Sequence, residues 1–120
     1  MNCLGIDFGT KNIGLAISIQ GIISPVGTYQ NNPRIFDSLK KVIDEYQLEK
    51  IYIGLSSGKI AELTTDFIKQ LNEKIDLPVE TVDESVSTIE SENYISPNNR
   101  RYSQKIDSIS AAVILKRALL

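Results

Sequence analysis

Residues 5–16 of this chain read GIDFGTKNIGLA, and this stretch decides what the fold can be. An apolar strand ends at one acidic residue, Asp7, a glycine-bounded turn follows, and a second apolar strand begins at once. A carboxylate at the end of a buried strand is costly unless a cation or a hydrogen-bond donor meets it. The pattern favours a divalent metal ion, or a nucleotide phosphate with its metal. The alternative for Asp7 is a turn carboxylate that accepts backbone N–H bonds.

The hydrophobic pattern outside this stretch predicts an α/β fold. Three strands are expected first, and Pro25 should place the third at a sheet edge, because proline cannot donate to a strand ladder. Helical periodicity then alternates with two further strands. The expected ranges are strands at 3–8, 13–19 and 21–29, a helix from about 33 to 46, a strand at 51–55, a helix ending near 75, a strand at 79–82, a helix near 86–95, a loop at 96–103 and a terminal helix at 105–119.

This order predicts a mixed five-stranded sheet flanked by helices. The first three strands form an antiparallel meander, and strand–helix–strand units then add strands 4 and 5 parallel to strand 1. The arrangement resembles the ribonuclease H-like architecture. The 120 residues suit one domain, residues 1–120.

Composition excludes several kinds of site. The chain has no histidine, which excludes Ser–His and Cys–His nucleophiles and histidine-ligated metals. The single Cys3 cannot form an internal disulfide, and no cysteine cluster indicates zinc. The start lacks a basic region followed by a long apolar run, and no stretch approaches the roughly 18 apolar residues that a membrane span needs. We therefore expect a cytoplasmic protein without a membrane partner.

Acidic residues fall at the expected ends of strands and at the start of the last helix: Asp7, the pair Asp83–Glu84, and Asp107. Ligands of open α/β sheets bind beyond the carboxyl ends of the strands. Two-metal phosphodiester chemistry needs several carboxylates that converge on hard cations about 3.5–4 Å apart. Glu84 is favoured over Asp83 as a ligand. The alternative for Asp83, Glu84 and Asp107 is a helix cap or a first-turn acid.

The charge distribution is compatible with a phosphate-binding rim, although the net charge of −2 argues weakly against a nucleic-acid partner. Residues 76–99 contain six acids and neither lysine nor arginine, whereas residues 100–120 contain five basic residues and one acid, Asp107. Basic residues near the motifs would contact phosphates with salt-dependent affinity, or else be solvated surface charges. These residues are Lys11, Lys59, Arg100, Arg101 and Lys105. Tyr102 beside the paired arginines can stack on an unpaired base.

Taken in order, the motifs resemble those of the YqgF/RuvX family. The resemblance rests on residues 5–16, IGL at 53–55, Asp83–Glu84 followed by STIE at 87–90, and IDSISAA at 106–112. That family comprises bacterial ribonuclease H-like proteins described as pre-16S rRNA nucleases or Holliday junction resolvases. The resemblance implies that Asp7, Glu84 and Asp107 form an acidic triad that binds magnesium or manganese.

Two positions depart from the family pattern. Ser85 stands where the family usually has an arginine, and the short loop Ser56–Lys59 replaces a longer glycine-rich loop. An arginine beside a metal site is a bidentate phosphate clamp that serine cannot reproduce. These departures favour one alternative, a non-catalytic module that binds nucleic acid or protein.

The sequence thus predicts a metal-dependent endonuclease, a hydrolase that cleaves phosphodiester bonds in structured nucleic acid. By resemblance its substrate is precursor rRNA, at the 5′ end of pre-16S rRNA, with a DNA junction as the runner-up. A second alternative is nucleotide binding, because the Asp-x-Gly-Thr turn at residues 7–10 also resembles the first phosphate loop of the actin, Hsp70 and sugar-kinase group. The pattern leaves open whether the protein is a monomer or a homodimer.

Overall fold

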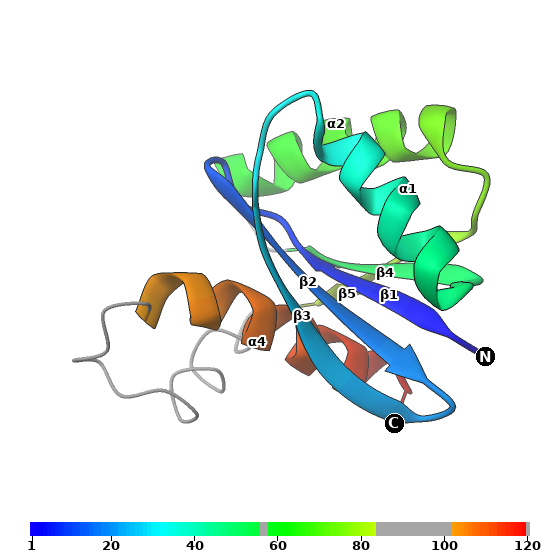
Figure 1. Ribbon diagram of the computed structural model, residues 1–120. Helices are drawn as coiled ribbons and strands as arrows, with labels where there is room; N and C mark the ends of the chain where they lie inside the picture. Colours follow the sequence, from blue (N-terminus) through cyan, green and yellow to red (C-terminus); the bar gives the residue numbers. More distant parts are fainter. Residues whose placement is uncertain (56–57, 84–101, 120) are drawn as a thin grey trace.

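The computed structural model describes residues 1–55, 58–83 and 102–119, with side chains from residue 107 onward in the last range. A five-stranded sheet lies at the centre, in the order β3-β2-β1-β4-β5. Figure 1 shows α1 and α2 over one face of this sheet and α4 over the other. The elements are β1 (Cys3–Asp7), β2 (Asn12–Ile19), β3 (Ile22–Gln30), α1 (Ile35–Tyr46), β4 (Lys50–Leu55), α2 (Lys59–Lys74), β5 (Val79–Asp83) and α4 (Tyr102–Leu119).

The strand pairing confirms the predicted topology. β1 pairs antiparallel with β2 and parallel with β4, and the outer pairs are antiparallel β2–β3 and parallel β4–β5. Pro25 lies on β3, at a sheet edge, next to a register irregularity between Leu15 and Ala16. The β2–β3 turn has positive φ at Gln20 (51°) and Gly21 (85°), as a two-residue turn between right-twisted strands requires.

Alternation along the strands creates two hydrophobic clusters, one on each face of the sheet. On β1, Leu4, Ile6 and Phe8 pack with α1 and α2, whereas Cys3 packs with Ala111 of α4. Because successive side chains of a strand point to opposite faces, odd-numbered residues of β1 face α4. Asp7 therefore belongs to the α4 face.

The terminal helix begins at Tyr102 instead of the expected residue 105. Ser103, Gln104 and Lys105 are all compatible with a helix interior, so the sequence carries no strong stop before the expected start. Asp107 therefore lies inside the helix and does not cap it. The expected helix near 86–95 and residues 96–101 of the expected loop lie outside the described residues.

The apolar residues of α2 and its end differ in their burial. Phe67, Leu71 and Ile75 are buried as their spacing predicts, but Leu63 is 44% exposed. Thr64 is buried in its place, and its hydroxyl donates a hydrogen bond to the Ile60 carbonyl oxygen at 2.8 Å. This internal hydrogen bond satisfies the hydroxyl group and so makes a buried threonine tolerable.

Candidate metal and phosphate site

Asp7 is the last residue of β1, at the carboxyl end of the sheet's central strand. Its side chain is half-buried and belongs to the face that α4 covers. In the ladder, Asp7 stands opposite Gly14 of β2. Residues opposite each other in an antiparallel pair have Cα atoms about 4.5–5.5 Å apart. Whatever contacts Gly14 from the α4 side is therefore a close neighbour of Asp7.

Asp107 is that neighbour. A Cβ added to Gly14 would overlap the carbonyl group of Asp107 and lie 2.9 Å from the backbone nitrogen of Ser108. Only a glycine at this point of β2 lets the backbone of α4 come so close. The absence of one side chain at Gly14 thus lets the backbone of Asp107 lie beside the end of β1, so two of the three predicted acids belong to adjacent segments.

Burial raises the pKa of the Asp107 carboxyl above its ordinary value. The cause is desolvation, which disfavours the charged form of a carboxyl group. A cation would stabilise the charged form of a half-buried carboxyl group, and carboxylate oxygens are the donors that Mg²⁺ and Mn²⁺ prefer. The residues present therefore fit a hard divalent ion.

Asp83 lies at the corresponding end of β5, opposite Leu55 of β4. Val82 packs in the cluster with α4, so alternation assigns Asp83 to the opposite face from Asp7. The Asp83 carbonyl oxygen accepts a hydrogen bond from Arg117 Nη1 at 3.3 Å. Glu84 lies outside the described residues and stays a predicted ligand. Within the described ranges no three acidic or cysteine side chains form a metal-binding group.

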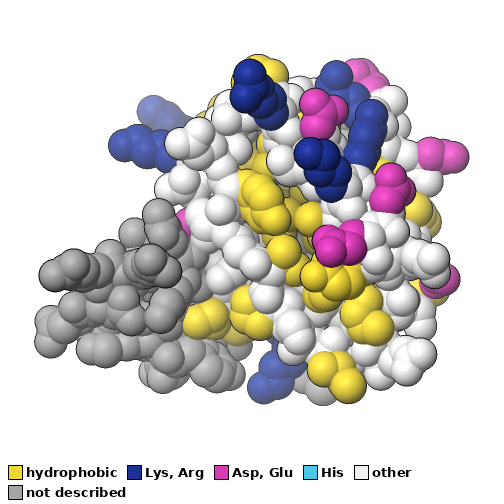
Figure 2. Space-filling view, in the orientation of Figure 1, with side chains coloured by type: hydrophobic (Ala, Val, Ile, Leu, Met, Phe, Trp, Pro, Cys, Tyr) yellow, Lys and Arg dark blue, Asp and Glu magenta, His cyan; other side chains and the backbone are white. Residues whose placement is uncertain are grey.

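Of the predicted phosphate contacts, the structure describes only the two lysines in the first part of the chain. Lys11 in the β1–β2 turn and Lys59 at the start of α2 are exposed. Both segments lie at one end of the sheet, and Figure 2 shows Lys and Arg side chains at that margin of the view, with further basic side chains among acids over α1 and α2. Arg100, Arg101 and the side chain of Lys105 lie outside what the structure describes.

Sequence reasoning missed two features of the site. Gly14 was taken only as part of a motif, although an isolated glycine inside a strand pattern often marks a close backbone approach. Arg117 was not considered, because its contact with the end of β5 joins segments far apart in the chain.

No helix in the described part of the chain could cross a membrane.

The fold is shared with solved resolvase structures. RuvC of T. thermophilus in complex with Holliday junction substrate superposes with a TM-score of 0.62 at 12% identity, covering 99% of this chain and 94% of that one. Fowlpox virus resolvase in complex with its Holliday junction DNA gives a TM-score of 0.55 at 14% identity, covering 100% and 99%. At such low identity these likenesses show the fold alone, and they confirm the predicted ribonuclease H-like class.

Sequence comparison identifies the family. The family model described as "RuvX: Holliday junction resolvase" matches residues 1–120. A Natranaerobius thermophilus protein named "Putative pre-16S rRNA nuclease" is 30% identical over 132 residues, which cover 99% of this chain and 94% of that protein. A Methylococcus capsulatus protein of the same name is 33% identical over 127 residues, covering 94% and 84%. The predicted resemblance is confirmed: the chain belongs to the RuvX family of nucleases.

Proposed function

We propose that this chain is a metal-dependent endonuclease that hydrolyses phosphodiester bonds in structured nucleic acid. The observation that supports this most directly is the close approach of the Asp107 backbone to Gly14, which stands opposite Asp7 in the ladder. Two carboxylates on rigid elements, in a chain of a nuclease family, are the start of a cation site.

Asp7, Glu84 and Asp107 are the residues that would hold Mg²⁺ or Mn²⁺. Glu84 follows β5 directly in the sequence and is proposed as the third ligand on the family resemblance. A divalent ion in such a site lowers the pKa of an attacking water and stabilises the leaving oxygen.

The chain's own residues would bring the substrate to this corner. Lys11 and Lys59 are exposed and would attract the phosphate backbone. Their contribution would be salt-dependent affinity, while the carboxylates determine where hydrolysis occurs. The basic residues Arg100, Arg101 and Lys105 are proposed to extend this contact along the substrate.

The favoured substrate is precursor 16S rRNA, cleaved toward its 5′ end, because the RuvX relatives carry the name of that activity. A four-way DNA junction is the second candidate, since the family description itself names it. Resolving a junction needs two sites related by a two-fold axis, hence a homodimer, whereas a monomer suffices to trim RNA. Contacts to a 2′-hydroxyl would separate the two substrates.

The test is a cleavage assay with the full chain, Mn²⁺ and three substrates in parallel: a 5′ fragment of precursor 16S rRNA, a four-way DNA junction, and ATP. Strand cleavage that disappears in Asp7→Asn and persists in Asp37→Asn, a change at an exposed acid of α1, supports the proposal. Cleavage that survives Asp7→Asn contradicts it. ATP hydrolysis alone would favour the nucleotide-binding alternative, and binding without turnover would favour the non-catalytic module.

A further inference from the structure

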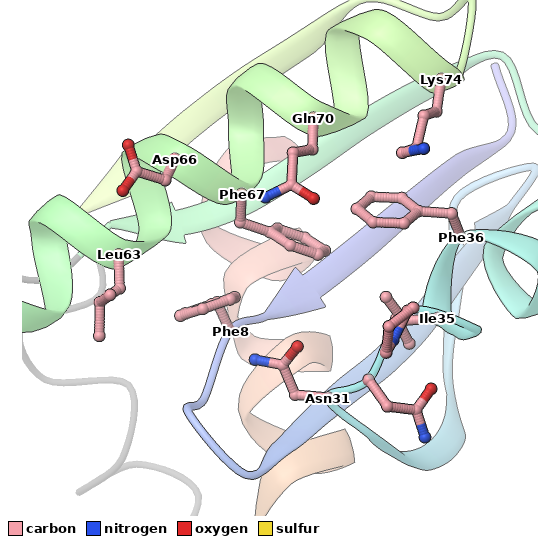
Figure 3. Close-up of a pocket in the computed structure, with 11 residues that line it drawn as sticks. Phe8, Asn31, Ile35, Phe36, Leu63, Asp66, Phe67, Gln70 and Lys74 are labelled. Carbon is pink, nitrogen blue, oxygen red and sulfur yellow. The ribbon is translucent and has the colours of Figure 1, made fainter.

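A pocket of about 520 Å³ opens on the face of the sheet opposite Asp7, between the β3–α1 connection and α2 (Figure 3). Three phenylalanines line it. The ring centroids of Phe8 and Phe67 are 5.0 Å apart, and those of Phe36 and Phe67 are 5.4 Å apart. Each phenylalanine is at least nine-tenths buried, so the three together form an apolar floor of which only a small part faces the pocket.

Polar groups from two segments complete the pocket. The Asn31 side-chain amide donates to the Gly9 carbonyl oxygen at 2.8 Å, which fixes its orientation. Figure 3 shows the Gln70 side chain reaching from α2 toward Phe67. Lys74 lies with its Nζ 5.4 Å from the centroid of the Phe36 ring. Asp66 also lines the pocket, which therefore combines an apolar floor with a few amides and two opposite charges. Apolar surface with a small number of placed polar groups is the usual composition of a small-ligand site.

The pocket and the proposed metal site include residues that are adjacent in the sequence. Phe8 directly follows Asp7, and the two side chains point to opposite faces of the sheet. Asn31 also donates its backbone N–H to the Lys11 carbonyl oxygen at 2.8 Å, so the pocket wall and the β1–β2 turn are clamped together. A strand with its phosphate at Asp7 would have an adjacent base within reach of Phe8.

The rim carries an apolar side chain that the core does not use. Leu63 is 44% exposed, and it lines the pocket on the α2 side. An exposed leucine beside a recess with aromatic walls adds apolar contact area for a ligand that enters it. The recess is too small for a duplex, whereas one planar base can stack on aromatic side chains and offer its edge to amides.

We propose that this pocket receives one unpaired nucleobase of the substrate, next to the phosphate bound at Asp7. The inference rests on the proposed nuclease function and adds to it the class of substrate: nucleic acid with an unpaired base beside the cleaved bond. Gln70 and the fixed Asn31 oxygen read the base edge, and Leu63 with the exposed part of the phenylalanine floor provides the apolar contact.

The experiment separates base binding from catalysis. Adenosine 5′-monophosphate and ribose 5-phosphate are titrated into the full chain in EDTA, and the methyl NMR signals of Ile35 and Leu63 are followed. Gln70→Tyr fills the pocket. Asn72→Tyr is the control, because it introduces tyrosine at an exposed α2 residue that does not line the pocket. In Mn²⁺, cleavage of a substrate with an unpaired adenosine is compared with that of its abasic form.

The expected result is base-dependent methyl shifts that weaken about tenfold in Gln70→Tyr and persist in Asn72→Tyr, with a similar loss of cleavage for the abasic substrate. The absence of a base-dependent shift, or equal losses in both variants, overturns base binding in the pocket. If Asp7-dependent cleavage is still observed in that case, the nuclease function stands. Absence of all cleavage defeats the nuclease function. It also overturns the inference as stated, even if adenosine 5′-monophosphate binds.

Discussion

The backbone of Asp107 lies against Gly14, so closely that β2 has no room for a side chain at that point. Gly14 in turn stands opposite Asp7 in the ladder. A residue near the start of the last helix thereby meets the end of the first strand, across almost the whole length of the chain. The candidate site depends on this contact more than on any other.

Gly14→Ala should separate the two acids. The added methyl group would overlap the Asp107 carbonyl, so α4 must move outward, at a cost of about 1–3 kcal/mol in the free energy of unfolding. Both the Mn²⁺-induced rise in Tm and the cleavage rate should fall. The measurement is thermal unfolding with and without Mn²⁺, followed by the cleavage assay.

Gly5→Ala is the matched control, because its Cβ would lie 2.6 Å from Leu115 Cγ, at a part of α4 further along the helix. It should lower stability in a similar way but retain more of the response to Mn²⁺. Equal losses of metal response in the two variants would show that general loosening of α4, and not the position of Asp107, is responsible.

Asp107→Asn should stabilise the metal-free protein at neutral pH. Burial raises the pKa of this carboxyl in the folded state, so folding favours the protonated form. Its contribution to stability is therefore present below the ordinary pKa of 3.8 and is lost as the pH rises through the raised value. Unfolding in EDTA between pH 3 and pH 8 measures the difference between variant and native chain.

The native chain and Asp107→Asn should converge at the acid end of that range and diverge toward neutrality, with the variant more stable. Saturating Mg²⁺ should reverse the order at neutral pH, because only the native chain retains both described carboxylates. A variant that is less stable in EDTA at every pH would mean that the charged Asp107 is already compensated within the protein.

The sequence was sufficient for the fold because its signals are local. The glycine-bounded turn after Asp7, the turn at Gln20–Gly21 and the continuous apolar run at 51–55 each define one element, and chain order fixes how these elements connect. The start of α4 was placed too late, since no residue before Asp107 gives a strong boundary signal. Leu63 has the same helical spacing as the buried Phe67 and Leu71, so the pattern alone does not predict its exposure.

The site was only partly accessible to sequence reasoning. Asp7 and Asp107 were both candidates from their positions in the pattern, whereas the triad with Glu84 came from the family resemblance. The physical cause of that pairing is one close approach at Gly14, which a pattern can suggest but cannot join to a partner. The aromatic pocket also escaped prediction, because Phe8, Phe36 and Phe67 come from three elements and meet only in the folded chain.

Glu84→Gln should abolish cleavage, whereas Asp83→Asn should be mild. If Glu84 is the third ligand, its loss should reduce the rate by at least about a hundredfold, since removing groups that merely hydrogen-bond to metal ligands already costs about 10–100-fold. Asp83 belongs to the other face of β5, and its contact with Arg117 uses the backbone carbonyl, which the variant keeps. The measurements are cleavage rate and Mn²⁺-dependent Tm. The opposite ranking of the two variants would assign the ligand to Asp83.

Lys11→Gln and Lys59→Gln should weaken binding to any nucleic acid without altering which bond is cut. Each lysine is exposed at the end of the sheet where Asp7 lies, and phosphate neutralisation is independent of sequence. Each change should lower the slope of log affinity against log salt by about one. Lys41→Gln, an exposed lysine of α1, is the control and should leave the slope unchanged. If all three variants show the native slope, the substrate does not pass over the β1–β2 turn and the start of α2, and the path proposed from Asp7 toward Phe8 fails with it.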